Sequence, residues 1–148
     1  MKKPRTSYAY SLKVTKCREG DFPYQNEVLS SPDAVYRFSQ SIIEEDREVF
    51  LTLFLNSRNK LVAINVQPGT LDQTAVYPRE VAKQALLSGG NSVILVHSHP
   101  SGSLQPSQAD RELTRLLKEA LMLIHVSVKD HVIVSEEGFY SFAEYNHI

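Results

Sequence analysis

Residues 93–110 read VILVHSHPSGSLQPSQAD, and this stretch decides the class of fold. Its first four residues form a continuous apolar run, as expected of a strand that is buried on both faces. A region rich in histidine, serine, proline and glycine follows and leads to Ser107, where an amphipathic segment begins. The stretch therefore predicts a buried strand that connects through a polar loop to a helix.

The segment after Ser107 has the apolar spacing of a helix that packs on a sheet. Its apolar stripe follows the i, i+3, i+4, i+7, i+8 pattern and consists of Leu113, Leu116, Leu117, Ala120 and Leu121. Asp110 lies on the extension of this stripe, on the same helical face as Leu113, Leu117 and Leu121. A carboxylate in that position is costly unless it is paired, solvated or bound to a metal.

The flanking sequence supplies further elements. We expect a helix from Ser31 and Pro32 to about residues 45–46, and a second helix from Pro78 to Gly89. We expect strands at residues 49–55 and 61–66, which form a hairpin, and near residues 123–128, 131–135 and 139–142. This order predicts a three-layer α/β or α+β fold, a mixed β-sheet flanked by helices.

Composition limits the classes of protein to consider. The chain has 148 residues, of which 42% are hydrophobic, so it can bury a core and form one domain. Its 16 basic and 17 acidic residues give a net charge of −1, which argues against a surface that coats nucleic acid or anionic membrane. The single cysteine, Cys17, excludes an internal disulfide, and no apolar run reaches the roughly 18 residues of a membrane helix. We expect a cytoplasmic domain without membrane contact.

The first residues differ from the remainder of the chain. Residues 1–21 carry six basic side chains with no acid before Glu19, and residues 8–14 alternate weakly like an edge strand. We therefore divide the chain into a basic arm with a short edge strand, residues 1–29, and a domain, residues 30–148. The arm could contact nucleic acid, or it could be a solvated terminus with a short strand.

His97 and His99 are candidate metal ligands. Residues two apart on a strand point to one face, so both imidazoles can reach one ion at the strand end. Together with Asp110 they would form a catalytic type of zinc site, in which water takes the fourth position. The alternatives are histidines with structural partners, and a helix cap in which Ser107 and Asp110 bond to each other's backbone. His125, His131 and His147 lack ligand spacing, and we expect His125 to be structural, on a strand.

The residues of this region resemble a known family. The pattern His97-x-His99, seven residues, Ser107-x-x-Asp110 is similar to the JAMM signature of the JAB/MPN-type metalloproteases, and the longer string resembles their RadC branch. The resemblance extends over roughly residues 30–144, through Arg47-Glu48-Val49-Phe50, Tyr77-Pro78-Arg79-Glu80-Val81, Asp130-His131 and Gly138-Phe139-Tyr140-Ser141-Phe142. The chain departs from that branch at Ser98 and Ser103, neither of which is an expected ligand.

The resemblance implies a fold, a metal and an activity. It implies a JAB/MPN architecture, which is like that of cytidine deaminases, and one catalytic Zn²⁺ held by His97, His99 and Asp110. It also implies that Glu48 is the general base and that the Ser107 hydroxyl donates to the oxyanion. From the residues alone Glu44, Glu45 and Asp46 are equally near along the chain. The expected reaction is hydrolysis of a peptide, isopeptide or related amide bond in a peptide or protein substrate.

Other functions stay open at this stage. Full-length members of the RadC branch carry a helix-hairpin-helix region, and this chain resembles the short stand-alone members of that DNA repair family. One alternative is therefore a DNA-repair-associated or nucleic-acid-binding accessory protein that performs no hydrolysis. Another is a metal-free scaffold, which the complete ligand set disfavours. The sequence leaves open the substrate and the oligomeric state, which includes a possible homodimer.

Overall fold

The structure is a computed structural model, and it describes residues 27–43, 47–69, 76–99 and 101–148. The elements in chain order are α1 (Pro32–Gln40), β1 (Val49–Leu55), β2 (Leu61–Pro68), α2 (Pro78–Ser88), β3 (Ser92–Ser98), α3 (Gln108–Met122), β4 (Ser127–Ser135) and β5 (Gly138–Ser141). The strands form one five-stranded sheet in the order β2-β1-β3-β4-β5. The pair β3 and β4 is parallel and the other pairs are antiparallel, so the predicted mixed sheet is confirmed.

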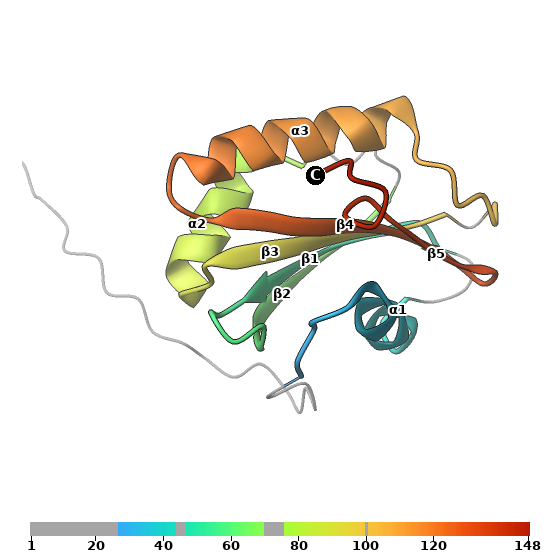
Figure 1. Ribbon diagram of the computed structural model, residues 1–148, viewed down its shortest axis with the longest axis horizontal. Coiled ribbons are helices and arrows are strands. Elements are labelled where there is room, and N and C mark those ends of the chain that lie inside the picture. Colours follow the sequence, from blue (N-terminus) through green and yellow to red (C-terminus); the bar gives the residue numbers. More distant parts are fainter. Residues whose placement is uncertain (1–26, 44–46, 70–75, 100) are drawn as a thin grey trace, which may run out of the picture.

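Helices cover both faces of the sheet, which gives three layers (Figure 1). α1 lies on one face, and α2 and α3 lie on the other. α3 is the crossover between the parallel strands β3 and β4, a connection that parallel strands require. The predicted three-layer arrangement is therefore confirmed.

The two central strands are buried along their whole length. All seven residues of β1 and all seven of β3 are buried, as the continuous apolar runs predict. Alternate residues supply two cores: Leu51, Leu53 and Leu55 face α1, whereas Phe50 and Phe54 face α2 and α3.

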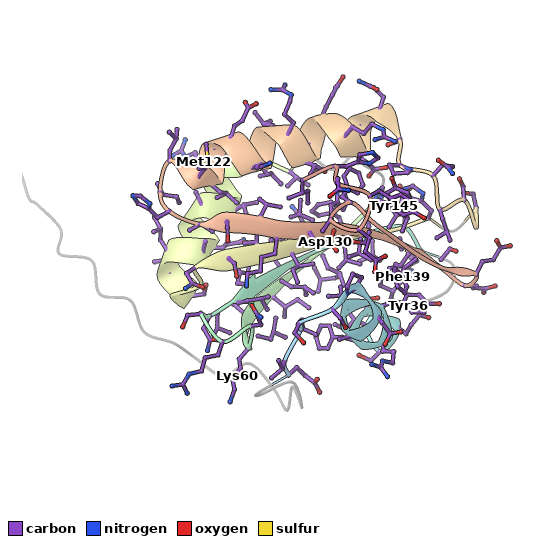
Figure 2. All side chains as sticks on the ribbon, viewed as in Figure 1. Tyr36, Lys60, Met122, Asp130, Phe139 and Tyr145 are labelled. Atoms are coloured by element: carbon purple, nitrogen blue, oxygen red, sulfur yellow. The ribbon has the colours of Figure 1, made fainter. Side chains whose placement is uncertain are left out.

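Contacts from α1 and from the residues before it complete the core on the α1 face of the sheet. The Tyr36 hydroxyl donates to the Ser135 carbonyl at 3.1 Å, and its ring lies 5.4 Å from that of Phe139. Figure 2 shows Tyr36 of α1 beside Phe139 of β5. Leu29 is buried in the same core, and Val28 bridges to Lys60 at the β1–β2 turn. The expected arm of residues 1–29 otherwise lies outside the described residues.

The helix boundaries follow their capping residues. Ser31 accepts a hydrogen bond from the Ala34 amide at 3.2 Å, and Gly89 takes a positive φ of 72° at the end of α2. The expected end of the first helix near residues 45–46 is wrong, because α1 ends at Gln40. The Ser41 hydroxyl donates to the Phe38 carbonyl there, and such local bonds compete with helix continuation.

The C-terminal strands also differ from the expectation. Residues 127–135 form one strand, β4, rather than parts of two, and residues 123–125 form a turn. His125 has a φ of 57° in this turn, so its expected place on a strand is wrong. β4 continues through Asp130 because hydrogen bonds satisfy that buried carboxylate.

Asp130 fastens the segment after β5 to β4. Its Oδ1 accepts from the amides of His131 at 2.8 Å and Ala143 at 3.0 Å, and its Oδ2 accepts from the Ser141 hydroxyl at 2.6 Å. Burial raises the pKa of Asp130, and these hydrogen bonds partly offset that effect. The contacts hold Phe142 beside β4, where its ring stacks on His131.

No helix within the described ranges has the length and apolar character needed to cross a membrane.

We expect Asp130→Ala to lower the free energy of unfolding by about 3 kcal/mol, because three donors lose their acceptor. Asp130→Asn should keep most of the stability, since its amide oxygen can still accept from two backbone N–H groups. Chemical denaturation measures both variants. Asp33→Ala, at an exposed ion pair with Arg37, serves as control and should cost about 1 kcal/mol or less. Equal losses in Asp130→Ala and Asp33→Ala would contradict the clamping role.

Candidate metal centre

The sheet and α3 bring the candidate ligands together at one end of the domain. His97 lies near the end of β3, His99 follows it, and Asp110 lies in the first turn of α3. Figure 1 shows the β3–α3 loop at the same end of the sheet as the β4–β5 turn. His97 lies on the same face of β3 as Val93 and Leu95 and contacts Phe50 of the core under α3.

The three predicted ligands contact one another. His97 Nδ1 lies 2.8 Å from Asp110 Oδ1 and 3.2 Å from His99 Nε2. His99 Nε2 lies 3.5 Å from Asp110 Oδ2. Ligands about 2.0–2.1 Å from a tetrahedral zinc ion are about 3.3 Å apart. The 3.2 and 3.5 Å separations are close to this value, whereas the 2.8 Å contact between His97 Nδ1 and Asp110 Oδ1 is that of a hydrogen bond.

The outer ring nitrogens of both histidines have acceptor-only partners. His97 Nε2 lies 2.9 Å from Glu48 Oε1, and His99 Nδ1 lies 2.8 Å from the Ser103 carbonyl oxygen. A neutral imidazole has a single N–H, and each of these contacts requires it. The inner nitrogens, His97 Nδ1 and His99 Nε2, then carry lone pairs that point at each other and at the Asp110 carboxylate. Such a group of acceptors requires a positive charge, either a bound proton or a metal ion.

The loop before α3 sets the orientation of His99. The Gly102 amide donates to the His99 carbonyl at 3.0 Å, and Gly102 has a φ of 80°, a conformation that favours glycine. This turn brings the Ser103 carbonyl under His99 Nδ1. The bond fixes the ring so that Nε2 points toward Asp110.

Ser107 and Asp110 form a reciprocal cap at the start of α3. The Ser107 backbone N–H and hydroxyl each donate to Asp110 Oδ2 at 2.7 Å, and the Asp110 amide donates to Ser107 Oγ at 3.0 Å. This is the capping pattern that the sequence offered as an alternative to a metal site. The two are compatible, since the cap engages Oδ2 and leaves Oδ1 directed at His97.

The charges of this cluster are coupled. Burial opposes ionisation of Asp110, but its contacts with the ring nitrogens of His97 and His99 and the hydrogen bonds from Ser107 outweigh it and hold the pKa of Asp110 well below the usual range. The bond with Asp110 raises the pKa of His99, although burial opposes this shift. Asp110 is therefore a carboxylate at any moderate pH, as a metal ligand must be.

His131 also belongs to this cluster, and the sequence spacing did not predict it. Ligand atoms of His97, Asp110 and His131 lie within 4.8 Å of one another. Burial lowers the pKa of His131 to about 3, so the ring is neutral. β4 pairs with β3 in parallel and thereby brings His131 to the site. The feature of the sequence that could have indicated His131 is its place within an otherwise apolar strand segment.

Other residues from the sequence analysis lie elsewhere. His125 is exposed in the turn after α3, and His147 bonds to the Tyr140 hydroxyl at 2.9 Å. Glu48 is at the site, whereas Glu44, Glu45, Asp46 and Cys17 lie outside the described residues.

A cavity of about 310 Å³ adjoins the cluster. It lies between α1, the loop after β3 and the β4–β5 turn, and His99 forms part of its wall. Its other lining side chains are mostly polar and include Gln40, Arg47, Ser101 and Glu137. The size is at the lower end of the range for small-molecule sites.

Comparison with known proteins finds one family. Residues 29–147 match the family described as "RadC-like JAB domain". A "UPF0758 protein" of Janthinobacterium sp. (strain Marseille) is 48% identical over 122 residues, which are 81% of this chain and 54% of that protein. A "UPF0758 protein" of Pseudomonas fluorescens (strain SBW25) is 45% identical over 136 residues, 90% of this chain and 61% of that protein. The chain therefore spans little more than half the length of these curated relatives.

We expect zinc binding to release protons and to weaken as the pH falls. His99 in the metal-free protein is protonated below its raised pKa, and zinc must displace that proton. The proton stabilises the metal-free fold below about pH 6.5, and this contribution is lost as the pH rises through the raised pKa. Zinc should therefore raise the melting temperature more at pH 8 than at pH 6.

Titration calorimetry in buffers of different ionisation enthalpy counts the released protons, and thermal melts give the stability. His99→Ala should bind zinc weakly and release fewer protons, whereas His125→Asn, outside the cluster, should behave as the parent protein. A zinc effect that is equal at both pH values, with no proton release, would contradict the coupling.

Proposed function

The chain belongs to the RadC-like JAB domain family, and from that membership and the geometry of its site we propose a zinc-dependent hydrolase of the JAMM type. The proposed reaction is cleavage of a peptide, isopeptide or related amide bond. One observation carries the proposal: ring nitrogens of the buried His97 and the partly exposed His99 converge with the buried Asp110 carboxylate, at separations of 2.8–3.5 Å.

The donor set suits zinc. His97, His99 and Asp110 would hold the ion, since two imidazoles and one carboxylate are typical ligands of catalytic zinc. Zinc bound there would supply Lewis-acid polarisation of a carbonyl group and activation of water. The partners on the far side of each ligand, Glu48, Ser103 and Ser107, match the outer contacts that orient metal ligands in proteins.

Glu48 is the proposed proton carrier. Its side chain is 24% exposed, so the carboxylate contacts both the site and solvent. The Glu48 carbonyl accepts from the Gly69 amide at 2.9 Å, and the next residue, Val49, donates to the Ser98 hydroxyl at 2.7 Å. This fixed backbone holds the carboxylate beside His97. To act as the base, Glu48 would leave its contact with His97 Nε2, accept a proton from the attacking water and deliver it to the leaving amine.

The contacts of Ser107 support a positioning role ahead of oxyanion stabilisation. A serine hydroxyl has one hydrogen, and Ser107 donates it to Asp110 Oδ2. An oxyanion would therefore have to compete with Asp110 for this donor. The α3 N-terminus can still favour negative charge near the site.

The cavity beside His99 is the proposed substrate site. Its hydroxyl, amide, cationic and anionic side chains suit a polar chain segment rather than a large apolar group. This is consistent with a peptide or isopeptide substrate, which carries amide groups and charged side chains.

We expect Glu48→Gln to keep zinc and lose hydrolysis by about 100-fold or more, since an amide cannot accept the proton. His97→Ala and Asp110→Ala should lose zinc as well as activity. Elemental analysis measures the zinc, and a mixture of fluorogenic peptides and lysine isopeptides reports cleavage. Glu80→Gln removes an exposed carboxylate on α2 and is the matched control. Full activity in Glu48→Gln would contradict its role as the base.

The alternative accessory function has a separate test. It depends on the basic residues of the arm, and it predicts DNA binding that weakens steeply with added salt and with replacement of Lys2, Lys3 and Arg5. A fluorescence-anisotropy titration with duplex and single-stranded DNA at two salt concentrations measures it. Binding that is absent at both concentrations would remove this alternative.

A further inference from the structure

His131 is a fully buried histidine at the centre of the domain. It is 0% exposed on β4. Its ring stacks on Phe142 at a centroid distance of 4.8 Å and meets Phe50 edge-on at 5.9 Å. Two aromatic neighbours and the strand therefore fix the plane of the imidazole.

The hydrogen bonds of Thr114 determine which nitrogen of His131 carries the proton. The Thr114 hydroxyl lies 2.6 Å from the Asp110 backbone carbonyl oxygen, to which it must donate its one hydrogen. The same hydroxyl lies 2.7 Å from His131 Nδ1. Thr114 can only accept there, so Nδ1 carries the N–H and Nε2 of the neutral ring is a lone pair.

This lone pair is directed at the candidate metal centre. His131 Nε2 is buried and has no hydrogen-bond partner among the described residues. It lies 3.9 Å from Asp110 Oδ1 and within 4.8 Å of a ligand atom of His97. A buried acceptor that faces a carboxylate without a donor is unfavourable unless a cation lies beside it.

The distance indicates how His131 would join the site. With metal–ligand bonds of about 2.1 Å, tetrahedral neighbours are about 3.4 Å apart and opposite ligands about 4.2 Å. The 3.9 Å separation lies between these limits and corresponds to a wide angle at the ion. An ion of higher coordination number accommodates such a ligand.

We infer that His131 Nε2 is a fourth protein ligand of the metal, which would then be held by three imidazoles and one carboxylate. The inference rests on the proposed metal site and adds to it a ligand outside the His97, His99 and Asp110 set. Because a reacting water still needs a position, the ion would bind at least five ligands. Thr114 would act as a positioning residue that holds the Nδ1–H tautomer.

Cobalt substitution tests the inference without a substrate. Co²⁺ has weak visible bands with five or six ligands and intense bands with four. The Co²⁺-loaded parent protein should show weak bands, and His131→Phe, which preserves the aromatic packing, should show intense bands and an affinity about 10-fold or more lower in a chelator competition. Thr114→Val should weaken binding in the same direction, and His125→Asn should change neither measurement.

X-ray absorption at the zinc edge of the loaded parent protein is a second measurement that needs no variant. Three imidazoles per zinc support the inference, and two overturn it. Identical Co²⁺ spectra for the parent protein and His131→Phe also overturn it, while the proposed zinc site stands. A parent protein that binds neither metal overturns both the inference and the proposed function.

Discussion

A buried carboxylate surrounded by imidazole lone pairs is stable only when a positive charge lies among them, and Asp110 places the domain under this constraint. It is 0% exposed, and its Oδ1 faces ring nitrogens of His97 and His131. The two donors of Ser107 satisfy Oδ2, so the cation requirement falls on the Oδ1 side alone. The polar cluster therefore lacks one positive charge, which a metal ion or a proton can supply.

The sheet holds this cluster in place by surrounding it with a rigid apolar core. β1 and β3 are buried throughout, and Phe50 pairs with His97 across them. Leu117 and Leu121 of α3 are fully buried against the same face, which sets the height of Asp110 above the strand ends. The ligands thus come from a strand end and a helix start whose separation is set by core packing rather than by the loop between them. Such rigid placement is what a metal site requires.

Sequence reasoning recovered the parts of the structure that depend on local patterns. The two-residue spacing of His97 and His99 and the helical phase of Asp110 predicted their meeting, because strand and helix periodicities fix side-chain directions. Glu48 came from the family resemblance, since spacing could not separate it from the neighbouring acids. His131 was missed because only the parallel pairing of β3 and β4 brings it to His97. The early end of α1 and the continuity of β4 depend on side-chain hydrogen bonds of Ser41 and Asp130, which periodicity does not report.

The first turns of α3 couple the cap, the metal ligand and the buried histidine into one unit. Ser107 holds the Asp110 carboxylate, and Thr114, one turn later, holds His131 through Nδ1 while donating to the Asp110 carbonyl. A shift of this helix would therefore displace an aspartate oxygen and an imidazole lone pair together. Local helix hydrogen bonding and the cluster's need for a cation consequently act on the same atoms. Binding of an ion should stabilise the start of α3, and a well-capped α3 should in turn keep the ligands in place for the ion.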